Sequence, residues 1–157
     1  MKIHLWSVGK PHDGYVKQGI DDFTQRITKY YPVAWKIIAP ARQTVNTTQA
    51  DVKKQEAQNI LQLLDKDDYL VLLEEKGRLL SSVDLANWLQ QRANQSTRNL
   101  IFLIGGAFGV DETINAKANF KWSLSALVFP HQLVRLILAE QIYRACTINR
   151  NEKYHHT

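Results

Sequence analysis

The sequence predicts an α/β protein with a mostly parallel sheet and helices on both of its faces. Two observations carry this prediction. Segments with strand character alternate five times with segments of helical periodicity, a pattern typical of parallel strands joined by helices. The runs 68–75 and 99–106 are largely apolar without alternating polarity, as expected of strands that helices cover on both sides.

In the first half of the chain, residues 3–8 and 33–39 are expected to be strands, because each is a short β-rich run followed by glycine or proline. The helix between them ends at Pro32, and its apolar residues recur at steps of three and four. Its buried face is expected to comprise Val16, Ile20, Phe23, Ile27 and Tyr30. A second helix is expected after Thr48, a candidate N-cap. Its inward side chains are expected to be Val52, Ala57, Ile60, Leu61 and Leu64.

In the second half, Gly77 is expected to turn the chain after the third strand. Ser81 followed by Asp84 resembles the capping box of a third helix. Residues 122–129 are expected to be the fifth strand. The closing helix begins at Pro130, a residue suited to the first turn.

Length and charge narrow the class of protein. The 157 residues (18.1 kDa) show no repeat and no linker, so residues 1–157 are expected to form a single domain. Twenty Lys and Arg against fifteen Asp and Glu give a net charge of +5. This mild basic bias favours a polyanionic partner such as nucleic acid.

The sequence also indicates where the protein resides. The N-terminal apolar run is too short for a signal peptide, and no window reaches the roughly 18 apolar residues that a membrane span requires. The single cysteine, Cys146, lies in an apolar helix and allows no internal disulfide. We therefore expect a soluble, cytoplasmic protein that does not enter a membrane, with Cys146 in its core.

The ends of the predicted strands are the first places to look for a site, because open α/β sheets bind ligands beyond the carboxyl ends of their strands. Three of these ends stand out, at residues 72–77, 105–109 and 130–131. Gly105 and Gly106 could expose backbone amides and let a ligand approach closely. They could equally clear space for a tight turn.

Several kinds of site are disfavoured. The glycines lack the GxGxxG spacing of a dinucleotide site, and neither GxxxxGK[ST] nor GxSxG occurs. The five histidines show no metal-ligand spacing, so no metal is expected. Glu74 and Glu75 are neighbours on a strand end, which points them in opposite directions and disfavours an acid–base pair.

The closing helix is apolar nearly all round but contains Arg135. A helix of this kind must be covered on both sides, and in so small a domain a second subunit is the expected cover, which predicts a homodimer. A buried guanidinium is costly unless it meets an anion or a ligand. The alternative is a salt bridge to Glu140 or to another remote acid. The polar tail brings basic and aromatic residues that could contact RNA, although most C-termini fray.

Five motifs in order, "LLEEKG", "FLIGGAFG", "SLSALVFPHQLVR", "EQIYRA" and "YHHT", together with the opening "MKIHLWSVGK", resemble the RlmH family. Members of this family are bacterial SPOUT-class methyltransferases that act on 23S rRNA. The resemblance covers the whole chain and is densest over residues 101–155. It implies a SPOUT-type α/β fold with a C-terminal trefoil knot, an obligate homodimer and S-adenosyl-L-methionine as methyl donor. It also implies methylation at N3 of a pseudouridine in a hairpin loop of 23S rRNA in the assembled ribosome.

The resemblance also implies site residues. The donor-binding positions would be Leu73, Gly105, Leu124, Ser125, Ala126, Leu127, Val128 and Phe129. For the reaction itself, our hypothesis is that Arg135 stabilises the N3 anion or clamps a phosphate, and that His131, Tyr154 and His155 place the nucleobase. No general base is identified.

One departure and two alternatives remain. The family tail commonly runs Tyr-His and then Lys or Arg, whereas His156 and Thr157 stand here, which puts an RNA contact by the tail in doubt. From the residues alone, a nucleotide-cofactor oxidoreductase on a doubly wound sheet and a non-catalytic α/β ligand-binding module stay open.

Overall fold

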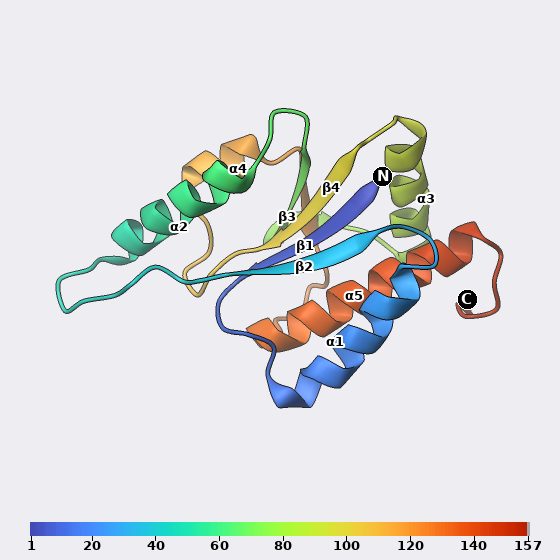
Figure 1. Cartoon of the computed structure of the whole chain (residues 1–157), viewed down its shortest axis with the longest axis horizontal. Coiled ribbons are helices and arrows are strands. Elements are labelled where there is room, and N and C mark those ends of the chain that lie inside the picture. The colour runs from blue at the N-terminus through green and yellow to red at the C-terminus, as the bar shows by residue number, and fades with distance from the viewer. Residues whose placement is uncertain (157) are drawn as a thin grey trace.

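In the computed structural model, which describes residues 1–156, five parallel strands form one sheet in the order β2-β1-β4-β3-β5 (Figure 1). The strands are β1 (Lys2–Val8), β2 (Val33–Ile38), β3 (Tyr69–Leu79), β4 (Asn99–Ile104) and β5 (Phe120–Ser123). Each of the four strand pairings is parallel. The predicted α/β class is therefore confirmed.

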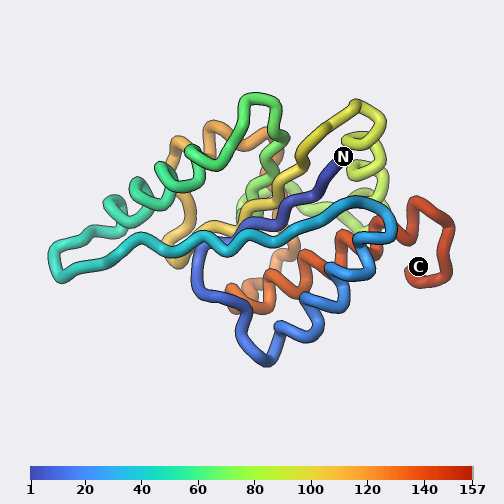
Figure 2. The backbone as a smooth tube through the Cα atoms, in the orientation of Figure 1, coloured from blue at the N-terminus to red at the C-terminus, as the bar shows by residue number. Residues whose placement is uncertain are grey.

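Five helices cover the two faces of this sheet (Figures 1 and 2). They are α1 (Gly14–Ile27), α2 (Gln49–Leu63), α3 (Ser82–Asn94), α4 (Glu112–Lys117) and α5 (His131–Asn149). The first core packs residues of α1, α3 and α5 against the sheet, and the second core packs residues of α2 and α4 against the other face. α5 lies between α1 and α3, which cover much of its apolar surface.

Successive side chains along a strand point alternately into the two cores, so a buried strand is apolar on both faces, as the apolar runs predicted. In β4, Leu100 and Phe102 belong to the core under α5, whereas Ile101 and Leu103 belong to the core under α2. All four side chains are at most 1% exposed. Cys146 is buried as expected, and burial raises the pKa of its thiol to about 12.

The helix starts largely follow the sequence. The Thr48 side chain accepts from the Asp51 amide, and the Asp51 carboxylate accepts from the Thr48 amide, which completes a capping box. Ser81 accepts from the Asp84 amide at 3.0 Å, which supplies one half of such a box. The prediction that Leu61 points inward is wrong: Leu61 is exposed, because it lies about 100° around α2 from the buried Ile60.

Two predicted boundaries around β3 and β5 are also wrong. Gly77 does not turn the chain: β3 continues to Leu79, and its residues 74–77 form a bulge between two pairings with Trp122. The fifth strand is not 122–129, because β5 ends at Ser123 and residues 124–129 form an irregular segment. β3 offers no further pairing partner beyond Leu79, so the apolar run leaves the sheet.

No helix among residues 1–156 is long and apolar enough to span a membrane. No three His, Cys, Asp or Glu side chains gather as metal ligands within the same residues. The assignment of residues 1–157 to a single domain stays a prediction.

Candidate functional site

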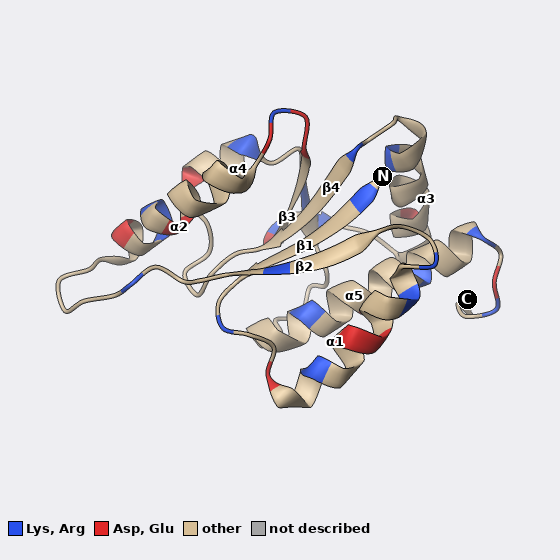
Figure 3. Cartoon of the chain, in the orientation of Figure 1, with Lys and Arg blue, Asp and Glu red and all other residues tan. Residues whose placement is uncertain are grey.

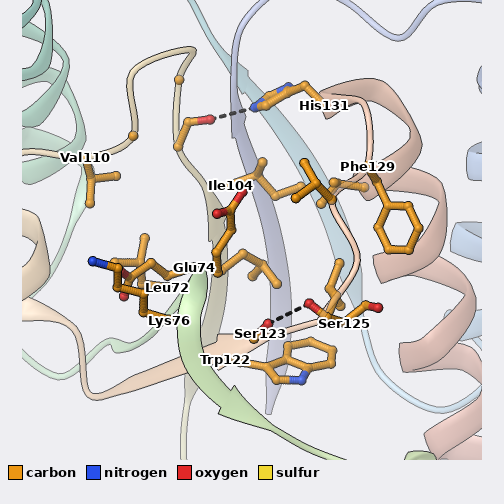
Figure 4. Close-up of a pocket in the computed structure, with 18 of the residues that line it drawn as sticks. Leu72, Glu74, Lys76, Ile104, Val110, Trp122, Ser123, Ser125, Phe129 and His131 are labelled. Atoms are coloured by element: carbon orange, nitrogen blue, oxygen red, sulfur yellow. Dashed lines mark hydrogen bonds between the residues drawn. The ribbon is translucent and has the colours of Figure 1, made fainter.

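A cleft of about 390 Å³ opens at the carboxyl ends of β3, β4 and β5 (Figure 4). Its walls come from residues 72–76 within β3, from the ends of β4 and β5 with the segments that follow them, and from the first turn of α5. Of the predicted donor-binding residues, seven line it: Leu73, Gly105, Leu124, Ser125, Leu127, Val128 and Phe129. Ala126 is exposed and does not line it.

The glycine loop after β4 forms one wall of the cleft. A Cβ on Gly105 would come within 2.8 Å of Val110, and a Cβ on Gly106 within 2.5 Å of the buried Glu56 carboxylate. The glycines therefore let the loop pack closely against its own end and against α2. Glu56 in turn accepts from the Ala41 amide at 3.1 Å, which ties this loop to the chain after β2.

His131, the first residue of α5, holds the glycine loop from the other side. Its Nε2 lies 2.6 Å from the Gly105 carbonyl oxygen (Figure 4). Since a carbonyl can only accept, Nε2 carries the proton and donates it in this bond. His131 also lines the cleft, so the structure brings it together with the predicted donor-binding residues.

The segment after β5 forms the opposite wall. The Ser123 hydroxyl donates to the Ser125 carbonyl at 3.0 Å, and the Leu127 amide donates to the Ser125 hydroxyl at 3.0 Å. These bonds hold a turn that leaves Leu127 70% and Val128 76% exposed. Exposed apolar side chains beside a cleft indicate a binding surface for a ligand or a partner.

Glu74 is a residue of the cleft to which the sequence assigned no role. It lies in the bulge of β3, and its carboxylate points into the cleft (Figure 4). Strand geometry disfavours an acid–base pair of Glu74 and Glu75 but does not predict the position of a single carboxylate. Glu75 also lines the cleft, but its side chain is exposed.

Arg135 is fully buried and lies outside the lining of the cleft. Its Nε donates to the Ser7 hydroxyl at 2.9 Å, and one amino nitrogen donates to the Lys10 carbonyl at 2.8 Å and to His12 Nδ1 at 3.1 Å. The other amino nitrogen is buried without a hydrogen-bond partner among the described residues. No carboxylate of the described residues forms a salt bridge with Arg135, and Glu140 pairs with Arg144 instead.

This guanidinium fixes the loop between β1 and α1. The pKa of Arg135 is lowered chiefly by burial, and Asp13 opposes this shift. The pKa of His12 is lowered by burial and next by the charge of Arg135. The unprotonated Nδ1 of a neutral His12 can accept the hydrogen bond that Arg135 donates. The His12 ring packs edge-on against Trp35, with centroids 4.9 Å apart.

The tail folds back on the C-terminal half of α5, and Arg144 holds it there. The Arg144 guanidinium lies 3.1 Å from His155 Nδ1 and 4.7 Å from the centroid of the Tyr154 ring. It also contacts the Glu140 carboxylate at 2.7 Å. Burial raises the pKa of the Tyr154 hydroxyl, and the negative charge of Glu140 adds to this effect. Thr157 lies outside the residues that the structure describes.

The tail and the cleft of one chain are far apart. His131 begins α5, whereas Arg144 lies near its end, and at about 1.5 Å per residue the helix rises by roughly 20 Å between them. Figure 2 shows the tail curling beside the far end of α5. Tyr154 and His155 are therefore not brought together with His131 within one chain.

Comparison with known proteins agrees with this architecture. A family model described as "Predicted SPOUT methyltransferase" matches residues 1–155. The chain is 41% identical to ribosomal RNA large subunit methyltransferase H of Cytophaga hutchinsonii over 99% of this chain and 100% of the relative. The relatives of the same name from Parabacteroides distasonis and Flavobacterium johnsoniae are 40% and 41% identical, each over 99% of both chains. The chain therefore belongs to the family of SPOUT methyltransferases that includes ribosomal RNA large subunit methyltransferase H.

Proposed function

We propose that this protein transfers a methyl group from S-adenosyl-L-methionine to N3 of a pseudouridine in a hairpin loop of 23S rRNA, acting on the assembled ribosome. The observation that carries the proposal is the cleft, whose walls are formed by the strand ends where the sequence motifs fall. The names of the full-length relatives support ribosomal RNA as the substrate. Family membership favours this reading over an oxidoreductase or a non-catalytic module.

The chemistry of the cleft fits the donor. Its volume lies within the range of small-ligand sites, about 300–1,000 Å³. Apolar side chains of the lining can hold the faces of an adenine ring against one wall, while the backbone groups of residues 124–129 can pair with its edge. S-adenosyl-L-methionine would supply a methyl group bound to a sulfonium sulfur. The leaving group is then a neutral thioether, which needs no acid to protonate it.

The protein's own part is mainly positioning. The His131 contact with Gly105 holds the glycine loop against the start of α5, which fixes the width of the cleft. N3 must lose its proton as it accepts the methyl group. We infer that His131, Tyr154 and His155 orient the pseudouridine base for this step. For Arg135 we propose an indirect role, because its buried guanidinium holds the loop after β1 instead of facing the cleft.

We infer that the active form is a homodimer in which the tail of one subunit completes the cleft of the other. The separation of Tyr154 and His155 from the cleft within one chain supports this arrangement. So do the exposed apolar side chains Leu79, Leu127 and Val128 near the walls of the cleft. Family membership supports the C-terminal trefoil knot, which we include in this proposal.

The net charge of +5 supports a polyanionic substrate only weakly. Figure 3 shows basic and acidic residues interspersed along α1 and α2. Binding of free RNA is therefore expected to be weak and sensitive to salt. We infer that the folded shape of the ribosome contributes to recognition.

The test is mass spectrometry of 23S rRNA from cells with and without the gene. We expect the N3-methylpseudouridine signal to disappear with the gene and to return when the wild-type gene is supplied on a plasmid. The His131→Ala variant, produced at the same level, should not restore it. An unchanged signal in the deleted strain would overturn the proposed reaction, as would a purified protein that binds NAD but no S-adenosyl-L-methionine.

A further inference from the structure

Glu74 is an unpaired carboxylate in a largely apolar cleft. Figure 4 shows its side chain rising from β3 into the cleft. Glu74 is partly buried and has no hydrogen-bond or ion-pair partner within residues 1–156. The nearby walls include the apolar side chains Leu72, Ile104 and Phe129. A carboxylate that faces a ligand cleft without a partner of its own can meet a cationic group of the ligand.

The backbone around Glu74 accounts for its direction. Leu73 and Arg78 both pair with Trp122 of β5, so residues 74–77 form a bulge that pairs with neither neighbouring strand. Bulges of this kind redirect side chains and are common beside active sites. Gly77 closes the bulge against β5, where a Cβ would come within 2.7 Å of the Trp122 backbone nitrogen.

The position of Glu74 across the sheet is central. β3 lies between β4 and β5, so the glycine loop stands on one side of Glu74 and residues 124–129 on the other. The sulfur of S-adenosyl-L-methionine is likewise the central atom of its molecule, with the adenosyl and methionine arms on either side. A donor that spans the two walls brings its sulfur to the middle of the cleft.

We propose that the Glu74 carboxylate contacts the sulfonium centre of the bound donor and makes the cleft distinguish donor from demethylated product. This inference rests on the proposed function. A sulfonium has a fixed positive charge and no hydrogen to donate, so backbone carbonyls cannot hydrogen-bond to it. A carboxylate at close range meets that charge directly. The other charged side chains of the lining, Glu75 and Lys76, are exposed at the rim.

The contact acts on binding and exchange of the donor rather than on the transfer step. When the methyl group leaves, the S–CH3 bond breaks, its electron pair stays on sulfur and the positive charge is lost. Glu74 then faces a neutral thioether, and the product loses the contact that held the donor. Stabilising the sulfonium in the ground state does not accelerate the reaction, and the contact weakens as the charge disperses in the transition state, so removal of Glu74 does not lower kcat.

Calorimetry of the purified full-length protein with S-adenosyl-L-methionine and with S-adenosyl-L-homocysteine tests this inference. Glu74→Gln removes the charge with little change in size. We expect it to weaken binding of the donor about tenfold and binding of the product less than about twofold, which is a loss of roughly one order of magnitude in selectivity. Glu74→Asp should recover part of this selectivity. In steady-state assays, Glu74→Gln should raise KM for the donor without lowering kcat, and any change in kcat should be an increase.

Glu75→Gln is the matched control, because it removes the same charge from the neighbouring exposed side chain. Its ratio of donor to product affinity should equal that of the wild type. An equal change in this ratio for both variants would assign the effect to a diffuse field and overturn the role of Glu74. Equal weakening of donor and product by Glu74→Gln would also overturn it. A wild-type protein that binds neither ligand would instead refute the proposed function itself.

Discussion

Arg135 reaches from α5 to the first strand and holds the loop that follows it. We predict that Arg135→Met lowers the free energy of unfolding by about 3 kcal/mol, because the Ser7 hydroxyl and the Lys10 carbonyl lose a charged donor in a buried site. Urea denaturation followed by circular dichroism measures this change. Arg42→Met is the control, since Arg42 is exposed and its replacement should shift stability by less than about 0.5 kcal/mol.

This experiment also separates the two roles considered for Arg135. If Arg135→Met is as stable as Arg42→Met but has lost methyl transfer, the direct role in the reaction is correct. Stability that falls together with activity supports the role in holding the loop. Donor binding near 4 °C, where more of the variant is folded, should then approach that of the wild type.

His12 links the stability of the same loop to pH. Burial and the neighbouring Arg135 lower the pKa of His12 below 6.5, while Asp21 opposes and Lys17 adds to this shift. Below about pH 6.5 the unfolded chain therefore takes up a proton that the folded protein resists, and stability falls as the pH falls toward the folded pKa. Well above pH 6.5, His12 is neutral in both states and does not lower the free energy of unfolding.

We predict that His12→Asn removes this part of the pH dependence. The asparagine amide oxygen can accept from Arg135 and does not titrate. Urea midpoints at pH 7.5 and pH 5.5 should therefore differ less for the variant than for the wild type. Equal differences in the two proteins would contradict the assignment to His12.

At the scale of residues, the sequence located the cleft but not all of the side chains in it. Gly105 was predictable because it directly follows β4, and the carboxyl ends of parallel strands meet at one edge. Leu73 and Phe129 were expected as strand exits too, but Leu73 lies within β3, and Phe129 lies six residues beyond the end of β5. The direction of Glu74 was not, because it depends on a bulge whose register is set by β5, far along the chain. The partners of Arg135 lie at the other end of the sequence, so no local pattern indicates them.

At the scale of elements, strand character and strand formation differ in the segment around β5. Residues 122–129 are apolar enough for a strand, but a strand needs a hydrogen-bonding partner, and β3 provides one only as far as Ser123. The Ser125 hydroxyl then binds the Leu127 amide and turns the chain. The apolar residues beyond Ser123 line the cleft, which hydrophobicity alone cannot distinguish from membership of the sheet.

Gly77 tests how closely β3 and β5 must approach. We predict that Gly77→Ala destabilises the protein by about 1–3 kcal/mol, since its methyl group would meet the Trp122 and Lys121 backbone at 2.7–2.8 Å. Because Trp122 and Ser123 line the cleft, donor affinity should fall as well. Urea denaturation and calorimetry measure the two effects.

Gly14→Ala is the control for this change. Gly14 begins α1, and a Cβ there meets no atom within 4 Å. Alanine should therefore raise stability by up to about 1 kcal/mol through its better helix propensity. If Gly77→Ala and Gly14→Ala changed the free energy of unfolding alike, β3 and β5 could move apart without loss of stability.

At the scale of the whole molecule, the separation of tail and cleft requires an explanation. One chain holds Tyr154 and His155 against Arg144, near the end of α5 opposite to His131. In a dimer with two antiparallel α5 helices, the tail of each subunit reaches the start of the partner helix. This arrangement predicts a mass of twice 18.1 kDa by light scattering in solution.

Mixed dimers test whether the tail acts across the interface. We predict that Gly105→Val, which crowds Val110 and closes the glycine loop, and His155→Ala, which alters the tail, are each inactive alone. When the two are unfolded together and refolded, half of the dimers contain one of each. In such a dimer, the intact cleft of the His155→Ala subunit receives the intact tail of the Gly105→Val subunit. Random pairing then restores about a quarter of wild-type activity.

The same mixture also distinguishes this arrangement from one in which each tail serves the cleft of its own subunit. If each tail served its own cleft, the intact cleft in a mixed dimer would always carry the altered tail, and mixing would restore nothing. Each variant refolded by itself controls for damage during the treatment. Recovery that rises with the fraction of mixed dimers would place His155 in the partner's site, whereas inactive mixtures of confirmed dimers would contradict a tail that acts across the interface.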